Sequence, residues 1–363
     1  MNIGFLNSAR SWGGNERWMQ MAAGELSASH QVFLFYRSPV IGDRFSNRKW
    51  RFPMLSEADF LSIGLLVWKI LTHRIDVLIP TKRKDIVLAG IAARLTRRYS
   101  VLRIGILRQY QPTIWNRLMY DWLADGIIVN ARAIRTQLTD TRFVNPEKIR
   151  VIYNGLLMED ILQKAAEPTD PFTGFQVISV GELSDRKGHD HAIRGFSSFL
   201  QRLPGEQRSR CRLVIAGSGQ ALRSLESLTE SLGIVNQVSF AGFLKNPYPS
   251  IRQSSAFLMV SRSEGLSNAL LEAMALGIPV VSTDAGGGAA EIIDHQKNGW
   301  LLPDAEPESI AEALFFLHNH PADARQMALN GTETIRNQFD PKRMGREIAS
   351  FLSGIVTGTR SPA

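Results

Sequence analysis

Residues Ser263–Glu291 read SEGLSNALLEAMALGIPVVSTDAGGGAAE, and this stretch decides the fold. A short apolar run before it, Ala256–Ser261, predicts a buried strand. After a Gly-Leu-Ser-Asn turn, Ala269–Leu276 is unbroken helix-forming sequence, and Ser267 or Asn268 is a suitable N-cap. The predicted order is strand, loop, helix, which is typical of domains built from a sheet covered by helices.

Two glutamates flank this turn: Glu264 lies in the loop, and Glu272 lies eight residues later in the predicted helix. The start of a helix presents free backbone N–H groups and a positive dipole end, which suit a phosphate. A carboxylate on either side can accept hydrogen bonds from the hydroxyls of a sugar or ribose. The pattern therefore indicates a nucleotide-sugar site. A purely structural role is the alternative, because glutamates near helix N-termini also interact favourably with the helix dipole.

The stretch resembles the E-x7-E signature of glycosyltransferase family 4, whose members are retaining enzymes with the two-domain GT-B fold. The similarity continues through Ala275–Val281, Thr283 and Gly286–Ile292. It implies that Glu272 holds the ribose hydroxyls of a nucleotide-sugar donor. It also implies that Glu264 contacts the donor sugar near the reacting carbon. The other donor-binding positions implied in this loop are Gly265, Leu266, Ser267 and Asn268.

A second loop, Gly181–Gly188, carries two adjacent cations, Arg186 and Lys187. Such charge can neutralise a departing diphosphate. The loop resembles the family's G-R-L-x3-K-G segment, whose Arg and Lys bind the diphosphate. Lys187 matches that Lys, but Glu182 stands where the Arg would be. Arg186 can supply the missing charge, because a guanidinium binds phosphate well. The alternative is that both cations are solvated loop residues.

Two further segments extend the resemblance. The VSFAGFL segment is similar to the one whose backbone meets the nucleotide base, so Gly242 and Phe243 are candidate base contacts. Strand-end packing is the alternative. The WGGNER segment resembles a glycine loop that lies beside the diphosphate and the acceptor. Its paired glycines, Gly13 and Gly14, would let a ligand approach the backbone closely. A tight turn without a ligand is the alternative there.

Strand and helix signals alternate along all 363 residues, which predicts an α/β protein with parallel sheets. The resemblance implies the GT-B fold, two Rossmann-like domains that face an interdomain cleft where the ligands bind. The polar segment Lys164–Gly174 contains two prolines and is the expected linker. We therefore expect an N-terminal acceptor domain, residues 1–166, and a C-terminal donor domain, residues 167–339. By resemblance, a C-terminal helix near residues 340–355 packs back on the first domain.

The expected elements follow from the apolar runs and helical patterns. Strands are expected at Asn2–Asn7, Gln31–Tyr36, Val77–Pro80, Ser100–Leu107, Gly126–Val129, Phe175–Val180, Arg212–Ala216, Val238–Ala241, Phe257–Val260 and Pro279–Ser282. Helices are expected at Asn15–Ala28, Ile86–Arg97, Asp190–Leu203, Ala221–Leu232, Asn268–Leu276, Pro307–Leu317 and Pro341–Leu352.

Neither a metal nor another cofactor is expected. The one cysteine, Cys211, allows no disulfide framework and no cysteine metal site, and no Asp-x-Asp pair occurs. Many relatives place a His, or sometimes an Asp, on the cleft loops of the first domain. None of the seven histidines falls in the loop after the Ser100–Leu107 strand. That region instead holds Arg103, Arg108, Gln109 and Tyr110.

The net charge of +8 resides in the first half of the chain. Residues 1–170 hold 24 Lys and Arg against 15 Asp and Glu, or +9, which leaves −1 for the rest. Basic residues cluster at Lys82–Lys84 and Arg94–Arg108, and Trp115, Tyr120 and Trp122 follow. A basic surface with aromatics can face an anionic membrane or nucleic acid. A well-solvated face is the alternative.

The sequence predicts a retaining, metal-independent glycosyltransferase. Its donor would be a UDP- or GDP-linked sugar and its acceptor a saccharide or lipid-linked molecule, in bacterial cell-surface polysaccharide or lipopolysaccharide synthesis. The alternatives are a non-catalytic subunit that binds nucleotide sugars, or another GT-B enzyme such as an epimerase or phosphorylase. No signal peptide or membrane-spanning helix is predicted. We expect a cytoplasmic protein, peripheral on the inner face of the cytoplasmic membrane, with no nucleic-acid partner.

Overall fold

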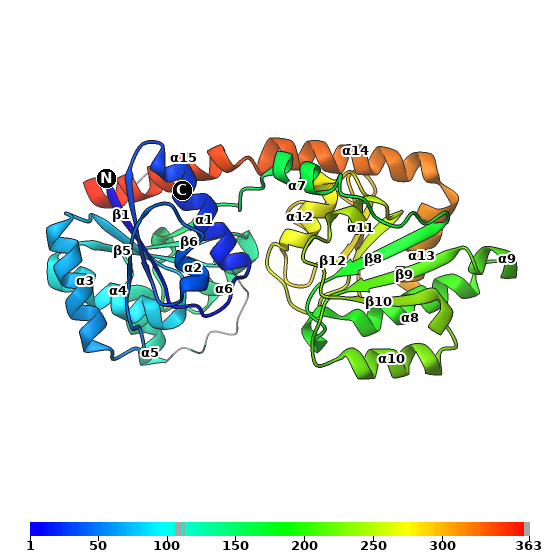
Figure 1. The fold of residues 1–363 in the computed structure, drawn as a ribbon, viewed down its shortest axis with the longest axis horizontal. Helices are drawn as coiled ribbons and strands as arrows, with labels where there is room; N and C mark the ends of the chain where they lie inside the picture. Colours follow the sequence, from blue (N-terminus) through cyan, green and yellow to red (C-terminus); the bar gives the residue numbers. More distant parts are fainter. Residues whose placement is uncertain (106–110, 112, 359–363) are drawn as a thin grey trace. The chain divides into compact units, whose positions relative to one another are not determined.

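The computed structural model describes residues 1–105, 111 and 113–358. It divides into two compact units, one of residues 1–155 with the chain from Phe339 onward, the other of Leu156–Gln338 (Figure 1). Each unit contains one parallel sheet with helices on it, so the predicted α/β class with two Rossmann-like domains is confirmed. In the part of the chain that is described, no helix has the length and apolar character needed to cross a membrane.

The sheet of the first unit has the order β3-β2-β1-β4-β5-β6-β7, and all its pairings are parallel. Its strands are β1 (Asn2–Asn7), β2 (Gln31–Tyr36), β3 (Arg48–Arg51), β4 (Val77–Pro80), β5 (Tyr99–Ile104), β6 (Gly126–Val129) and β7 (Ile149–Val151). The order reverses between β1 and β4. Sheets of this kind bind ligands beyond the carboxyl ends of the strands at such a reversal.

Helices cover both faces of this sheet. They are α1 (Gly14–Ser27), α2 (Pro39–Gly42), α3 (Phe60–Thr72), α4 (Arg83–Thr96), α5 (Ile114–Arg117), the short π-helix η1 (Leu118–Trp122), α6 (Arg132–Asp140), the 3-10 turn η2 (Pro146–Lys148) and α15 (Pro341–Thr357). Ile3 and Phe5 of β1 lie in one buried cluster with side chains of α1 and α15. Leu6 lies in another cluster with α3 and α4. Because successive strand side chains point to opposite faces, the sheet is the middle of three layers.

The sheet of the second unit has the order β10-β9-β8-β11-β12-β13, again parallel. Its strands are β8 (Phe175–Val180), β9 (Cys211–Ala216), β10 (Val238–Gly242), β11 (Ala256–Met259), β12 (Val280–Thr283) and β13 (Trp300–Leu302). Here the order reverses between β8 and β11, which carry the two loops singled out in the sequence.

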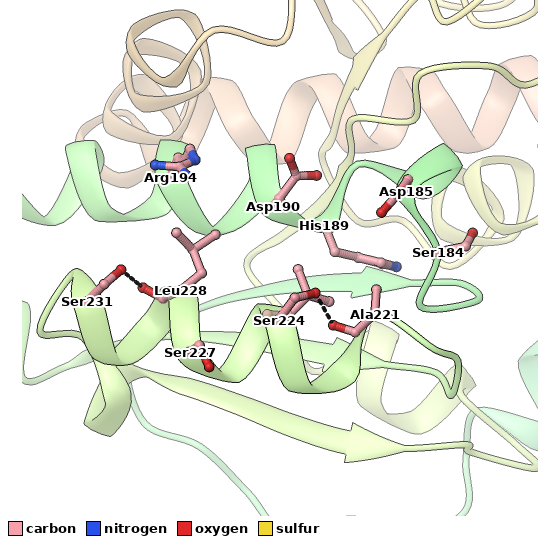
Figure 2. A pocket seen from close by; sticks show the side chains of 11 residues that line it. Ser184, Asp185, His189, Asp190, Arg194, Ala221, Ser224, Ser227, Leu228 and Ser231 are labelled. Atoms are coloured by element: carbon pink, nitrogen blue, oxygen red, sulfur yellow. Dashed lines mark hydrogen bonds between the residues drawn. The ribbon is translucent and has the colours of Figure 1, made fainter.

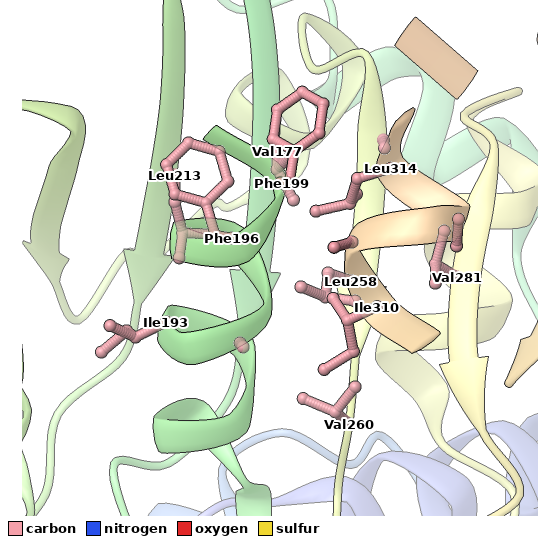
Figure 3. Packing of buried hydrophobic residues seen from close by; sticks show 14 of the residues in the cluster. Val177, Ile193, Phe196, Phe199, Leu213, Leu258, Val260, Val281, Ile310 and Leu314 are labelled. Atoms are coloured by element: carbon pink, nitrogen blue, oxygen red, sulfur yellow. The ribbon is translucent and has the colours of Figure 1, made fainter. Parts of the chain in front are cut away.

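Helices of the second unit are α7 (Met158–Lys164), α8 (His189–Gln201), α9 (Gly205–Arg208), α10 (Leu222–Ser231), α11 (Tyr248–Arg252), α12 (Asn268–Ala275), α13 (Pro307–Asn319) and α14 (Pro321–Gln338), with the 3-10 turns η3 (Asp185–Lys187) and η4 (Val235–Gln237). The main core lies between the sheet and α8 and α13 (Figure 3). Phe196 and Phe199 of α8 and Ile310 and Leu314 of α13 are buried there. This core fixes the start of α8, and with it the loop after β8.

The boundary between the units lies earlier than predicted. The sequence placed the linker at Lys164–Gly174, whereas the structure divides the chain between Gly155 and Leu156. The reason is α7, which packs against α11 and α12. The Asn246 side-chain amide also donates a hydrogen bond to the Lys164 carbonyl at 2.9 Å, so this segment belongs to the second unit.

Several elements were not predicted from the sequence. Strands β3, β7 and β13 are three or four residues long, too short for a clear alternation. Helix α14 follows α13 almost directly, and its mostly polar sequence carries little apolar signal. Helix α15, by contrast, was expected near residues 340–355, and it belongs to the first unit, where Met344, Ile348 and Leu352 join the core beside α1.

The contact between α8 and α13 generates a prediction about stability. A Cβ added at Gly195 would lie 2.4 Å from Ile310 Cβ, so Gly195→Ala must push α8 and α13 apart. We expect the unfolding free energy to fall by about 1–3 kcal/mol, as for other overpacked cores. Calorimetry of the purified variant measures this change.

Gly24→Ala in α1 is the matched control. An added Cβ there meets no described atom within 4 Å, and Ala stabilises an open helical position by about 0.5–1 kcal/mol relative to Gly. Equal stabilisation by both substitutions would contradict the close packing of α8 on α13.

Candidate functional site

Two loops meet at the reversal point of the second sheet. Strands β8 and β11 pair directly, so the loops that follow them lie at one edge of the sheet. Gly188 has a φ of 65°, and a Cβ there would lie 1.9 Å from the Val260 carbonyl oxygen, so only glycine allows this approach. The Arg262 N–H donates to the Arg186 carbonyl at 2.8 Å, which ties the second loop to the first.

A bidentate ion pair strengthens this junction. The Arg262 guanidinium donates to both carboxylate oxygens of Asp190, at 2.9 and 2.6 Å, and also to the Asp185 carbonyl. The Asp190 hydrogen bond and charge raise the pKa of Arg262, while Arg262 holds the pKa of Asp190 below its usual value against the opposing effect of burial. The two loops are thereby fixed to each other, and Arg186, Lys187 and Glu264 project from them.

The three residues predicted as catalytic converge on one atom. Glu264 Oε2 lies 2.7 Å from Arg186 Nη1 and 2.8 Å from Lys187 Nζ. Lys187 and Glu264 are largely buried, whereas Arg186 is exposed. Two cations therefore share one carboxylate oxygen, so Glu264 balances only part of their charge, and the further carboxylate of Glu182 lies 4.0 Å from Arg186. Paired cations at the edge of a sheet suit an anionic ligand.

Glu182, the departure from the family pattern, is directed toward the same cluster. Its carboxylate lies 4.0 Å from Arg186 Nη2, and its side chain is mostly exposed. A pair this long and exposed contributes little energy. Glu182 can therefore swing away from Arg186 at small cost.

The N-terminus of α12 lies in the second of these loops. Ser267 is its N-cap, with extended backbone and no capping hydrogen bond from its side chain. Gly265, Leu266 and Ser267 are buried, and Asn268 is half-buried. The Glu264 N–H donates to the Ala285 carbonyl at 2.9 Å, so the glycine segment after β12 supports this loop.

Glu272 occupies a different position from Glu264. It is buried within α12, where its Oε1 accepts a hydrogen bond from the Tyr248 hydroxyl of α11 at 3.2 Å. The structure thus brings Glu264 to the cations and Glu272 to the α11–α12 contact. Tyr248 was not predicted as a site residue, because a tyrosine in a short helix carries no pattern of its own.

The candidate base contacts lie at the end of β10. Gly242 has a φ of 65°, and its carbonyl accepts from the Gly217 N–H at 2.8 Å. Phe243, which follows it, exposes most of its ring. Strand β9 separates β10 from β8 in the sheet, so these residues do not belong to the Arg186–Glu264 cluster.

A groove of 450 Å³ lies beside this cluster, between α8 and α10 (Figure 2). It is lined by Ser184, Asp185, His189, Asp190, Arg194, Ala221, Ser224, Leu225, Ser227, Leu228 and Ser231. Arg186, Lys187 and Glu264 are not among its lining residues. The two aspartates make it a poor match for a diphosphate, so the size of this hollow does not identify the site.

His189, at the start of α8, is a buried packing residue. Its Nδ1 lies 3.2 Å from the Ser179 hydroxyl of β8. Burial lowers its pKa to about 4, and Lys187 adds to the effect against weaker opposing contacts. The ring is therefore neutral at physiological pH, and it packs against β8 beneath the loop that contains Arg186 and Lys187.

The first unit holds a polar cluster at its own reversal point. Asn7, at the end of β1, donates through Nδ2 to Glu16 Oε1 at 3.0 Å and to the Thr81 hydroxyl at 2.8 Å. Lys82 Nζ lies 2.7 Å from Glu16 Oε1. The sequence grouped Lys82 with a basic surface, and this is corrected here: its ammonium faces the buried Glu16.

The two predicted glycines begin α1 beside this cluster. Gly13 is the N-cap in an extended conformation that any residue can adopt, so its φ does not require glycine. A Cβ at Gly13 would lie 3.3 Å from Glu16 Oε2, which is tight. Gly14 is the first helical residue and is exposed. The sequence pointed to this loop but missed Glu16 as its buried carboxylate.

Arg103 of β5 completes the cluster. Its Nη1 donates to Asn15 Oδ1 at 2.8 Å and its Nη2 to Asn154 Oδ1 at 3.3 Å. Burial lowers the pKa of Arg103 to about 10, partly offset by Glu16, so it remains a cation. The other three residues predicted in that region, Arg108, Gln109 and Tyr110, lie outside the described residues.

Asp85 is a second buried carboxylate of this region that the sequence did not single out. It lies in the first turn of α4, and its Oδ2 accepts from the Ser8 N–H at 3.0 Å. Burial raises its pKa to about 6. Within the described ranges, no group of three or more His, Cys, Asp or Glu side chains could hold a metal ion.

Family models match most of the chain. The model described as glycosyl transferases group 1 matches residues 160–334, and the model described as glycosyltransferase family 4 matches residues 12–159. The lipopolysaccharide core biosynthesis glycosyltransferase LpsE of Rhizobium meliloti is 30% identical over 278 residues, which cover 72% of this chain and 76% of LpsE.

Other curated relatives are matched over a smaller share. The N-acetylgalactosamine-N,N'-diacetylbacillosaminyl-diphospho-undecaprenol 4-alpha-N-acetylgalactosaminyltransferase of Campylobacter jejuni is 29% identical over 231 residues, 64% of this chain and 60% of that protein. Across four relatives that include this one, the chain spans 43% to 60% of the relative's length.

Among solved structures, Anabaena HepE in complex with UDP-glucose superimposes with a TM-score of 0.79 at 21% identity. The superposition covers 98% of this chain and 100% of that one. At this identity the similarity concerns the fold alone, and it agrees with the predicted GT-B fold class.

The burial of His189 predicts how stability depends on pH. Its folded pKa, about 4, lies below the ordinary value of 6.5, so the unfolded chain takes up the proton first as the pH falls. The unfolding free energy should therefore drop by up to ~3 kcal/mol as the pH falls from about 6.5 to 4. In His189→Gln this part of the pH dependence should be absent, as measured by urea unfolding across that range.

His320→Gln is the matched control, because it removes an exposed imidazole from the same unit. The dependence of the unfolding free energy on pH should be the same in this variant as in the wild type. If His189→Gln retained the wild-type slope, His189 would not be a buried neutral group.

Proposed function

The chain belongs to the glycosyl transferases group 1 family, and we propose that it transfers a sugar from a nucleotide-diphosphate sugar to a saccharide or lipid-linked acceptor. The observation that carries this proposal is the convergence of Arg186 and Lys187 on Glu264 at the reversal point of the second sheet. Two cations beside a helix N-terminus are the groups that a diphosphate requires.

Arg186 and Lys187 are the proposed diphosphate ligands. Without a donor, Glu264 balances part of their charge. A bound diphosphate would compete for both cations and release the Glu264 carboxylate to accept hydrogen bonds from the donor sugar. When the bond between sugar and phosphate breaks, negative charge accumulates on the diphosphate, and the same cations stabilise it. In this proposal the cations do the work for which other enzymes use a metal ion.

The nucleoside would occupy the α12 side of the site. Glu272 would accept hydrogen bonds from the ribose hydroxyls, and Tyr248 would hold its carboxylate in place. The backbone N–H groups of Leu266–Asn268 would face the phosphates. The exposed ring of Phe243, next to Gly242, would supply an apolar surface for the base.

We propose that the reaction proceeds with retention at the anomeric carbon. The acceptor oxygen would bond to the carbon on the face from which the diphosphate leaves. The proton of the acceptor hydroxyl would pass to a diphosphate oxygen, so no protein base is needed at that step. The polar cluster of Glu16, Lys82 and Arg103 in the first unit, beside Gly13 and Gly14, is the proposed region of acceptor contacts.

The names of similar proteins guide the choice of substrates. HepE is described in complex with UDP-glucose, and the C. jejuni relative is named for a diphospho-undecaprenol substrate. We therefore propose a UDP-linked donor, ahead of a GDP-linked one, and an acceptor used in bacterial cell-surface polysaccharide or lipopolysaccharide synthesis. A lipid-linked acceptor would place the protein at the inner face of the cytoplasmic membrane.

The first experiment is a thermal-shift panel of UDP, GDP, ADP and their sugars. A ligand at a hundred times its Kd stabilises the folded state by about 2.7 kcal/mol, which is easily seen. We expect the UDP series to stabilise the wild type and to lose this effect in Glu272→Ala. No shift with any nucleotide, together with no sugar transfer, would instead favour a unit without catalytic activity, which Glu182 in place of arginine would then mark.

A second prediction tests whether Arg186 replaces the family arginine. Arg186→Ala should weaken UDP binding by about tenfold to hundredfold, because hydrogen bonds to charged groups contribute ~1.5–3 kcal/mol. Adding Glu182→Arg to that variant should restore much of the affinity, since it places a guanidinium at the family position. Isothermal titration calorimetry measures both changes.

Arg202→Ala is the matched control. Arg202 lies away from this cluster, and its guanidinium pairs with Glu308 at 2.6 Å. It should bind UDP as the wild type does. Wild-type UDP affinity in Arg186→Ala would show that Arg186 is not a diphosphate ligand.

The stereochemistry and the metal independence of the proposed reaction have their own tests. Proton NMR of the product reports whether the anomeric configuration is retained, and activity after chelator treatment reports metal independence.

A further inference from the structure

Helix α3 is apolar on all sides, yet only one of its faces is covered by protein. Its buried face consists of Ile63, Leu66 and Ile70, which pack into a core cluster with strand residues, and of Ser62. The opposite face is exposed. Its large side chains are Phe60 at 79%, Leu61 at 64%, Trp68 at 55% and Leu71 at 60% exposure.

The spacing of these residues defines a single surface. Positions 60, 64, 68 and 71 are three or four residues apart and so lie along one side of a helix, where Gly64 fills the remaining position. Leu55, just before the helix, is 68% exposed. A surface helix normally carries polar side chains on its outer side. A continuous apolar face in contact with water indicates an interaction surface.

Basic residues flank this apolar face. The edge strand β3 supplies Arg48, and the end of α3 supplies Lys69, with Arg74 just beyond it. The other two cations of β3 are engaged within the protein: Lys49 donates to the Gly42 and Phe45 carbonyls, and Arg51 donates to the Arg37 carbonyl. Lys69 Nζ lies 4.2 Å from the Trp68 ring and 4.5 Å from the Trp50 ring, so β3 and α3 are directly joined there. The chain from Phe60 to Ile75 contains no acidic residue.

The charged groups near this surface agree with a positive potential. Asp59 caps α3 through a hydrogen bond from the Ser62 N–H at 3.0 Å, and Asp76 pairs with Arg98 at 3.4 Å. Asp59 thus keeps its charge at the start of α3, whereas Asp76 and Glu57, which pairs with Arg83 at 3.5 Å, are balanced by arginines. Burial, together with Arg48 and Lys69, lowers the pKa of His73, so this ring adds no charge at neutral pH.

The basic segments that the sequence singled out are a weaker candidate. Among their side chains, Lys82 pairs with Glu16, Arg83 with Glu57, Arg94 with Asp125 and Arg98 with Asp76. Tyr120, expected among the surface aromatics, is buried. Their charge is partly neutralised within the protein, unlike the cations beside α3.

The length of α3 restricts how it could meet a bilayer. Thirteen residues extend roughly 20 Å at 1.5 Å per residue, too short for a hydrocarbon core of about 30 Å. An amphipathic arrangement of this kind lies flat at the interface, with aromatic and aliphatic side chains below the headgroups and cations at lipid phosphates. The apolar face and its basic border match that arrangement.

We propose that the outer face of α3, with Leu55 and the flanking cations Arg48, Lys69 and Arg74, binds the surface of an anionic lipid bilayer. This surface, the α3 face, is separate from the donor site. The inference deepens the proposed function, on which it rests for its biological setting, because a lipid-linked acceptor resides in a membrane.

The test is co-sedimentation with vesicles of phosphatidylglycerol and phosphatidylcholine, compared with vesicles of phosphatidylcholine alone. The wild type should bind the anionic vesicles, and less so at high salt. Leu71→Glu should reduce partitioning at least about tenfold, because it places a charge in the exposed apolar face that would enter the bilayer. Arg48→Ala should reduce it roughly fivefold and only on anionic vesicles, as expected for one cation near a charged surface.

Leu329→Glu is the matched control, since Leu329 is an exposed helical leucine of the second unit, at 56% exposure. It should bind vesicles as the wild type does. Equal binding by Leu71→Glu and the wild type, or no vesicle binding by the wild type, would overturn the proposal. A protein that dimerises in solution through the α3 face, shown by a mass that Leu71→Glu halves in sedimentation velocity, would also overturn it.

Failure of this inference and failure of the proposed function are distinguishable. UDP is a soluble ligand, so the thermal shift with UDP should be the same in Leu71→Glu and in the wild type. A normal UDP shift without vesicle binding leaves the donor site intact and removes the membrane surface. Vesicle binding without any nucleotide shift does the reverse.

Discussion

The Arg186–Glu264 cluster of the second unit depends on one close approach between two backbones. Strands β8 and β11 lie next to each other, and the loops that follow them can come together only because position 188 has no side chain. Any Cβ there would collide with the Val260 carbonyl. The bidentate pair of Arg262 with Asp190 then fixes the second loop on the first. Because of this junction, Arg186 and Lys187 both reach Glu264.

The two polar clusters differ in how easily they can be rearranged. Glu264 is held by two cations, one of them exposed, and an exposed pair contributes only about 0–1 kcal/mol. A ligand can therefore exchange the Arg186 contact at low cost, whereas the largely buried Lys187 can leave Glu264 only for a ligand that supplies a negative charge. Glu16 is buried, and its carboxylate accepts a hydrogen bond from Asn7 and pairs with Lys82. Removing these partners would leave a buried charge uncompensated. The Glu264 cluster can therefore exchange its contacts for those of a ligand, whereas the Glu16 cluster keeps a fixed arrangement.

The sequence predicted those features that depend on local pattern. Strands such as β1, β2, β4, β6 and β8 have the expected bounds, because buried parallel strands are continuous apolar runs with clear ends. Arg186, Lys187 and Glu264 meet as the motifs suggested. The Glu16–Lys82 pair could not be predicted, since it joins residues 66 positions apart whose meeting depends on the β1–β4 pairing. The α3 face was missed for a different reason: an apolar helix gives no sign in its sequence of which side remains uncovered.

The return of the chain to the first unit has a consequence for synthesis. Met344, Ile348 and Leu352 of α15 fill the core beside α1, and Met344 Sδ accepts a hydrogen bond from the Gly155 N–H at 3.1 Å. A ribosome makes α1 more than three hundred residues before α15, and the whole second unit is made between the sheet of the first unit and α15. The nascent first unit must therefore wait with one apolar face uncovered while the second unit, continuous in sequence, folds to completion. The first unit is therefore the first to be synthesised and the last to be completed. Until α15 packs against α1, the apolar face beside α1 is open to a chaperone.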